Sequence, residues 1–276
     1  TPIKSSAASD VYKRQEYKSF YTKTFHDFQE PLFWIHLNMD YPFRLKGILY
    51  FPKVKNKAEL ERGQVKLFCN QVFIADNIKE VIPEFLTLLN GVIDCPDIPL
   101  NVSRSFLQND REVQKISRHI TKKVADKLTG LFKNDREKFV QCWNDISVFI
   151  KVGCLKDEDF YSKVKDILIF KDLNGEYKNL DEFLGVAPES ETAEDKKDEE
   201  KKPVSVYYVS DEVGQSQYVN MFKNAGLNAI VCDTFVDPHF ISFLEYKNPE
   251  KWKFMRIDAD IDSALKDGEV NADDFK

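Results

Sequence analysis

Gly91-Val-Ile-Asp-Cys-Pro-Asp-Ile-Pro-Leu-Asn-Val-Ser-Arg-Ser-Phe-Leu-Gln108 leads from an apolar run through a loop toward a long helical pattern. Proline fixes φ and restrains the residue before it, so Pro96 and Pro99 hold this loop in few conformations. The loop then presents an arginine, a hydroxyl and two amides: Asn101, Ser103, Arg104 and Gln108. A stiff loop with these groups suits the binding of an anion such as a phosphate. The alternative is a connector whose arginine makes a surface salt bridge.

Three further stretches accompany this loop. They are Glu-Pro-Leu-Phe-Trp-Ile-His-Leu at 30–37, Gly-Ile-Leu-Tyr-Phe-Pro at 47–52, and Val-Phe-Ile-Ala-Asp-Asn at 72–77 with Ile-Pro-Glu-Phe-Leu at 82–86. With Ile98–Arg104 and Leu107-Gln108, and in the same order, these motifs resemble the middle domain of the ninety-kilodalton heat-shock chaperones of the bacterial HtpG type. The resemblance covers about residues 16–260. Four ordered motifs are a far more specific signal than one short pattern.

The resemblance implies a mechanism. In that family a separate N-terminal domain holds ATP with its Mg²⁺, and the middle domain supplies an arginine to the γ-phosphate when the chaperone closes. By motif position this arginine is Arg104, Gln108 is the accompanying polar group, and Asn101 and Ser103 shape the loop. The sequence contains no GxxxxGK[ST] loop, so we expect no cofactor on this chain alone and no autonomous ATPase.

The resemblance also implies partners. They are the N-terminal ATP domain, a C-terminal dimerisation domain and unfolded client proteins. Exposed aromatic side chains suit a promiscuous client surface, and a core position is the alternative for each candidate. The candidates are Phe28, Phe33, Trp34 and Trp252.

Composition sets the broad class. The chain has 276 residues, enough for two modest domains, and 42% of them are hydrophobic, which is typical of a globular protein. A net charge of −6 argues against a general nucleic-acid binder. No run approaches about 20 apolar residues, and no secretory leader is recognisable, so we expect a cytoplasmic protein without a membrane span. The five cysteines form no CxxC pair, which favours free thiols and argues against a metal site.

The predicted fold is α/β (α+β), with a larger αβα sandwich around a mixed sheet, a helical connector and a small parallel α/β sandwich. The boundaries are a non-family tail at 1–15, the larger subdomain at 16–134, the connector at 135–187, a flexible acidic linker at 188–202 and the small subdomain at 203–276. The linker contains no large apolar residue, so it cannot offset the entropy of ordering.

Hydrophobic periodicity predicts the elements. Residues 33–37 alternate as in a half-buried strand, further strands follow at 45–51, 65–69 and 72–74, and Pro83 opens a short helix that Gly91 ends. A helix after Asp110 carries an apolar stripe and a basic face, and helices follow at about 136–152, 159–168 and 180–184. The basic face could add a positive field to the loop, and a simply solvated face is the alternative.

After residue 203 strands and helices alternate, which predicts a parallel unit. Strands are expected at 204–209, 229–232 and 254–257, and helices at 217–225 and 238–246. The first strand is followed by Ser-Asp-Glu-Val-Gly instead of GxGxxG, which argues against a dinucleotide site. The main alternative to a chaperone segment is therefore a stand-alone protein-interaction module. A small-molecule enzyme is a weaker one, because no acid–base pair or nucleophile constellation can be assigned.

Overall fold

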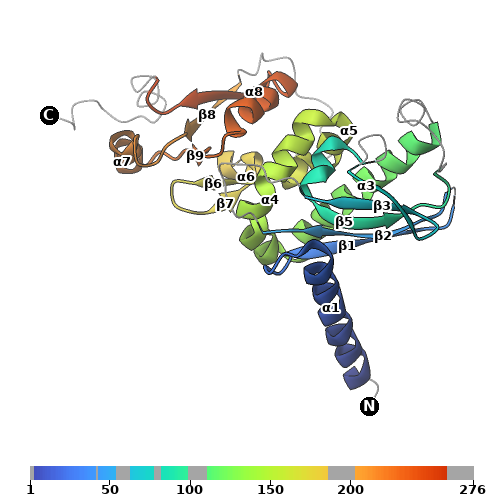
Figure 1. Cartoon of the computed structure of the whole chain (residues 1–276). Helices are drawn as coiled ribbons and strands as arrows, with labels where there is room; N and C mark the ends of the chain where they lie inside the picture. Colours follow the sequence, from blue (N-terminus) through green and yellow to red (C-terminus); the bar gives the residue numbers. More distant parts are fainter. Residues whose placement is uncertain are drawn as a thin grey trace. The chain divides into compact units, whose positions relative to one another are not determined.

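The computed structural model describes residues 3–41, 43–53, 63–77, 82–98, 111–185 and 203–259 (Figure 1). The chain divides into two compact units, Thr1–Val164 and Lys165–Lys276. Each unit is built on its own five-stranded sheet. The units meet between residues 164 and 165, whereas the sequence placed a boundary between 134 and 135. The predicted boundary between 15 and 16 falls inside α1 (Ile3–Phe25).

The sheet of the first unit is mixed, as predicted. Its strands are β1 (Phe33–Met39), β2 (Leu45–Phe51), β3 (Val65–Cys69), β4 (Val72–Asp76) and β5 (Asn90–Asp94), and their order is β1-β2-β5-β3-β4. Only the pairing of β3 with β5 is parallel among these strands. The order places the end of β5, where the Pro96 loop begins, between the start of β2 and the end of β3.

Helices cover both faces of this sheet. The alternation in β1 buries Phe33, Ile35 and Leu37 on one face, where α3 (Arg111–Asn134), α4 (Arg136–Lys156) and α5 (Glu158–Val164) pack together. Phe51 on this face meets Phe149 of α4 with ring centroids 5.2 Å apart. On the other face the end of α1 brings Tyr21 to 4.9 Å from Tyr50, and the rest of α1 leads away from the sheet (Figure 1).

The prediction that Gly91 ends a helix was wrong. The helical turn is the 3₁₀ helix η1 (Glu84–Leu88), and Gly91 lies inside β5, opposite Leu49 of β2 and Val65 of β3. A Cβ at Gly91 would approach Leu49 Cδ2 to 2.5 Å and Ile48 O to 2.8 Å. The glycine therefore serves the close approach of two strands, a role that local sequence does not distinguish from a helix stop.

The second unit contains the predicted parallel core. Its elements are η2 (Lys165–Ile167), β6 (Phe170–Asp172), β7 (Tyr177–Lys178), α6 (Leu180–Leu184), β8 (Val204–Val209), α7 (Ser216–Asn224), β9 (Ile230–Val231), α8 (Asp237–Lys247) and β10 (Trp252–Arg256). Strand β8 pairs in parallel with β9 and β10. Two short strands that the sequence reading missed, β6 and β7, extend this sheet in antiparallel pairings, so the second sheet is also mixed.

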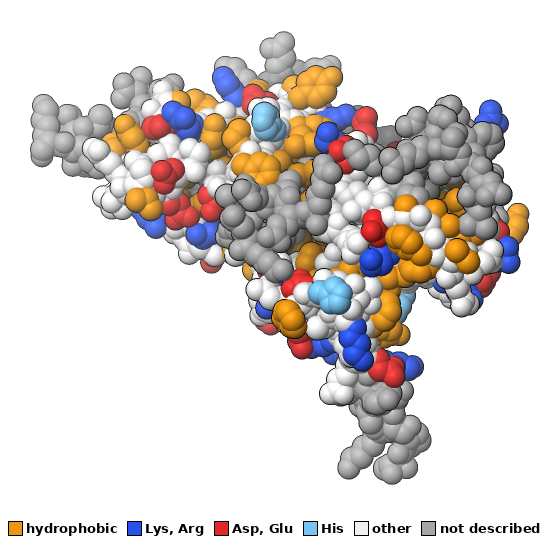
Figure 2. Space-filling model, viewed as in Figure 1, with side chains coloured by type: hydrophobic (Ala, Val, Ile, Leu, Met, Phe, Trp, Pro, Cys, Tyr) orange, Lys and Arg blue, Asp and Glu red, His pale blue; other side chains and the backbone are white. Residues whose placement is uncertain are grey.

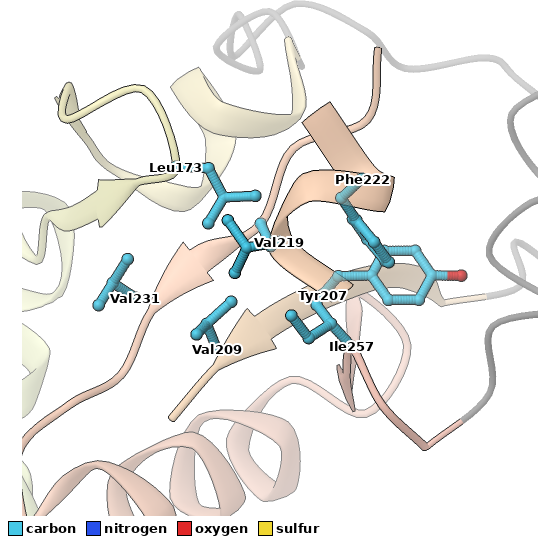
Figure 3. Packing of buried hydrophobic residues seen from close by; sticks show 8 residues of the cluster. Leu173, Tyr207, Val209, Val219, Phe222, Val231 and Ile257 are labelled. Atoms are coloured by element: carbon cyan, nitrogen blue, oxygen red, sulfur yellow. The ribbon is translucent and has the colours of Figure 1, made fainter. Parts of the chain in front are cut away.

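A separate hydrophobic core holds the second unit together (Figure 3). Val209 is fully buried, and the Tyr207 ring meets Phe222 of α7 edge to face at 5.2 Å. The remaining members come from α7, from β9 and the residue before it, from the β6–β7 turn and from the residue after β10: Leu173, Val219, Ala229, Val231 and Ile257. All members of this core lie within residues 165–276, the second unit.

Candidate functional site

The four residues predicted to bind phosphate, Asn101, Ser103, Arg104 and Gln108, lie outside the described residues. The structure describes what precedes and follows them in the chain. Residues 95–98, which we call the loop stem, come directly after β5, and α3 begins at Arg111. The loop stem and the start of α3 are thus the two described supports of the predicted site.

Backbone hydrogen bonds fix the loop stem to the sheet. The Cys95 N–H donates to Phe68 O at 3.0 Å, and the Ile98 N–H donates to Cys95 O at 3.3 Å. The Cys69 thiol lies 3.6 Å from Pro96 O and 3.5 Å from Ile98 O, so its single proton can reach either carbonyl. Ile98 is buried at 4% exposure. The chain therefore leaves the sheet from a defined position.

One ion pair joins the loop stem to the start of β2. Asp97 Oδ2 accepts the Arg44 backbone N–H at 2.6 Å, and Asp97 Oδ1 accepts from Arg44 Nη2 at 2.9 Å and from Nε at 3.3 Å. The backbone N–H of Arg44 and then its guanidinium lower the pKa of the Asp97 carboxyl below its ordinary value. This pair was not predicted from the sequence. No local signal marks it, because the partners are 53 residues apart.

The helix that follows the loop is anchored on its apolar stripe. Val113, Ile116, Ile120, Val124 and Leu128 are each at most 1% exposed, which confirms the buried face of α3 at five of its six predicted positions, and the sixth, Leu131, is partly buried. The opposite side carries an exposed basic row at helical spacing, made by Arg111, Lys115, Arg118 and Lys122.

The charges of Lys122 and of the adjacent Lys123 act on a neighbouring side chain. Burial lowers the pKa of His119, and Lys123 and Lys122 lower it further. The arrangement places positive charge beside the second end of the loop.

The aromatic client-binding candidates fall into different environments. Phe28 is 92% exposed, whereas Phe33 is 6% exposed and stacks on Phe51 at 4.4 Å. Trp34 is half-buried, 5.5 Å from the Tyr17 ring, and Trp252 is half-buried in β10. Of the four, Phe28 alone offers a largely accessible ring.

Other exposed hydrophobic side chains were not among the candidates. They include Val72 and Phe73 on the edge strand β4, and Phe235 and Tyr246 at α8. In the visible face of Figure 2, hydrophobic side chains are interspersed with charged ones. A strand's position at a sheet edge is a tertiary property, so the strand pattern of β4 could not reveal that Phe73 is exposed.

Within the described ranges, no group of three or more His, Cys, Asp or Glu side chains could hold a metal ion. All five cysteines are buried and free of disulfide bonds. In the same part of the chain, no helix combines the length and apolarity that a membrane crossing would need.

Comparisons with known proteins place this geometry among relatives. A family model described as Hsp90 protein matches residues 1–274. The chaperone protein HtpG of Bacteroides thetaiotaomicron is 44% identical over 261 residues, covering 95% of this chain and 37% of that protein. HtpG of Porphyromonas gingivalis is 46% identical over 248 residues, covering 90% of this chain and 35% of that protein. The chain thus spans about a third of the length of these curated relatives.

Among solved structures, the middle domain of a Plasmodium falciparum heat shock protein superimposes with a TM-score of 0.63. The match covers 90% of this chain and 96% of that domain, at 22% sequence identity. At this identity the likeness concerns the fold.

Proposed function

Because the chain belongs to the Hsp90 protein family, we propose that it is the middle segment of an ATP-dependent molecular chaperone and supplies Arg104 to the γ-phosphate of ATP. In this proposal a separate N-terminal domain holds ATP and Mg²⁺, and a C-terminal domain dimerises the protein. The chain alone is then no ATPase. Its place of action is the cytoplasm.

The observation that carries the proposal is the position of the motif. Ile98–Arg104 and Gln108 stand between a stem fixed to the sheet and a helix with an exposed basic row. One domain holds the phosphate and another delivers the guanidinium. The positive guanidinium then stabilises the negative charge on the phosphoryl group in the transition state. Because the arginine reaches the phosphate only on closure, hydrolysis is coupled to a conformational change. Asn101 and Ser103 shape the loop, and Gln108 accompanies the arginine.

Client binding is the second part of the proposal. An exposed aromatic ring offers apolar area without demanding a strict shape, which suits partners that are unfolded. The 92% exposure of Phe28 supports it as a contact, while Trp34 and Trp252 have smaller accessible areas and Phe33 faces the core.

A reconstitution experiment tests the phosphate role. This chain alone should show negligible ATP hydrolysis, and joining it to its cognate ATP domain should raise the rate. Arg104→Ala in the joined protein should remove most of that gain, with the roughly 10³–10⁵-fold contribution of such arginines in GTPases as the upper bound. Arg14→Ala, which removes an exposed arginine from α1, is the matched control and should leave the rate unchanged.

An unchanged rate in Arg104→Ala would falsify the phosphate role. If, in addition, the isolated chain still bound unfolded proteins, the stand-alone interaction module would be the better description.

A further inference from the structure

We propose that Arg44 and Asp97 form a clamp that sets how the Arg104 loop leaves the sheet, so that both act as positioning residues for the phosphate contact. This inference rests on the proposed function and adds two residues to its site. Arg44 directly precedes β2, Asp97 lies in the loop stem, and both are described by the structure.

The sheet brings the two residues together. Strands β2 and β5 are antiparallel neighbours with Lys46 opposite Asp94. Continuing this register outward places residue 44, just before β2, opposite residue 96, just after β5. Asp97 therefore emerges beside Arg44 at the point where the stem leaves the sheet.

The contacts differ from an ordinary surface ion pair. Exposed pairs between flexible side chains contribute little, and here the side chains are 62% and 34% exposed. However, both carboxylate oxygens of Asp97 are used, one by the guanidinium and the other by the Arg44 backbone N–H. The guanidinium fork on Oδ1 and the backbone N–H on Oδ2 together fix the orientation of the carboxylate as well as its distance. The carboxylate is tied to the sheet backbone at one side and to the loop at the other.

Other contacts of the stem involve its backbone groups. Cys69 and Phe68 contact carbonyl and amide groups of residues 95–98, which fixes the path of the chain up to Ile98. Asp97 is the stem residue whose side chain adds a directional constraint from a second strand. It stands seven positions before Arg104 in the sequence. Since a displacement of about 1 Å can cost up to about 10²-fold in rate, a small change in the exit direction is enough to matter.

The test uses the full-length chaperone that carries this segment. Asp97→Asn keeps the size of the side chain and removes its charge, and Arg44→Lys keeps the charge and removes the fork. Both should lower kcat for ATP hydrolysis by roughly three- to thirtyfold, within the range that misplacement of a catalytic group produces. The KM for ATP and the melting temperature should stay unchanged, because ATP is bound elsewhere and the pair lies at the surface.

Two controls separate positioning from general damage. Glu212→Gln breaks the exposed pair of Lys171 with Glu212 in the second unit, at 3.0 Å, and should leave kcat unchanged. In an Arg104→Ala background, Asp97→Asn should cause no further loss, since the clamp acts only through that arginine.

The outcomes distinguish the clamp from the proposed function. Normal kcat in both Asp97→Asn and Arg44→Lys, with Arg104→Ala impaired, would overturn the clamp and leave the arginine's role intact. An additive loss in the double variant would also overturn it, because the pair would then act by another route. If Arg104→Ala were itself without effect, the proposed function would fail and the clamp with it.

Discussion

Two phenylalanines five positions apart show how much a single residue's environment depends on the fold. Phe33→Ala should destabilise the protein by about 3–5 kcal/mol, because the ring is 6% exposed and its removal leaves a cavity beside Phe51. Phe28→Ala should change stability by no more than about 0.5 kcal/mol, because the ring is 92% exposed. Urea unfolding of both variants measures the difference, and comparable losses would contradict the burial assigned here.

Buried thiols and phenols make stability depend on alkaline pH. Burial raises the pKa of Cys95 from 9.0 to about 11, and it also raises the pKa of Tyr21 and Tyr50 above the ordinary value. Between pH 9.0 and about 11, the Cys95 thiol loses its proton in the unfolded chain but keeps it in the folded chain. The stability contribution is therefore complete below the unfolded pKa and is lost as pH rises.

The expected result is a free energy of unfolding that falls as pH rises above 9.0, the ordinary thiol value. Urea titrations at a series of alkaline pH values measure it. Cys95→Ala should reduce the slope between that value and about 11. A free energy that rose across the same range would contradict the assignment.

At the scale of elements, two helical glycines have opposite roles. A Cβ on Gly153 of α4 would lie 2.7 Å from Phe160 Cε1 and 3.0 Å from Phe85 Cδ2, so this glycine permits close packing of α4 on α5 and η1. On Gly130 of α3 the nearest atom would be Asn134 Nδ2 at 4.0 Å. The two positions are alike in helix propensity and differ only in their neighbours.

Gly153→Ala should therefore destabilise the protein, because overpacking costs about 1–3 kcal/mol and exceeds the propensity gain. Gly130→Ala should stabilise it by about 0.5–1 kcal/mol, since the alanine meets open space. Thermal melting of the two variants should give shifts of opposite sign. A shift in the same direction for both would show that packing around Gly153 is looser than described.

At the scale of the whole molecule, the two units each have a sheet and a core. The chain cut after Val164 should fold alone with a cooperative thermal transition, because α4 and α5 belong to the first unit. The chain cut at the sequence-based boundary after Asn134 should not, because it loses Phe149, which packs on Phe51 and Phe85. Circular dichroism and amide NMR dispersion report the difference, and a folded 1–134 fragment would favour the sequence-based boundary.

Much of the fold followed from local pattern. The stripe from Val113 to Leu128 predicted α3 because helical periodicity is short-range, and Gly185 marked the end of α6 because its φ of 67° favours glycine. The strands β6 and β7 were missed because each contains a single apolar residue, whereas the equally short β9 is wholly apolar. The acidic stretch 188–202 lies outside the described residues, and its assignment as a linker stays a prediction.

The candidate site, like the fold, was partly predictable from local sequence and partly decided by tertiary packing. The sequence alone determined the family motifs, and with them the residues to test, because Arg104 and Gln108 sit at fixed spacing within a short segment. It also determined most helices and strands, whose signals extend over a few neighbouring positions. The tertiary structure alone decided that Phe28 is exposed, that Gly91 lies in a strand and that Arg44 meets Asp97. These outcomes depend on which segments pack together, and contacts spanning 53 residues leave no trace in local periodicity.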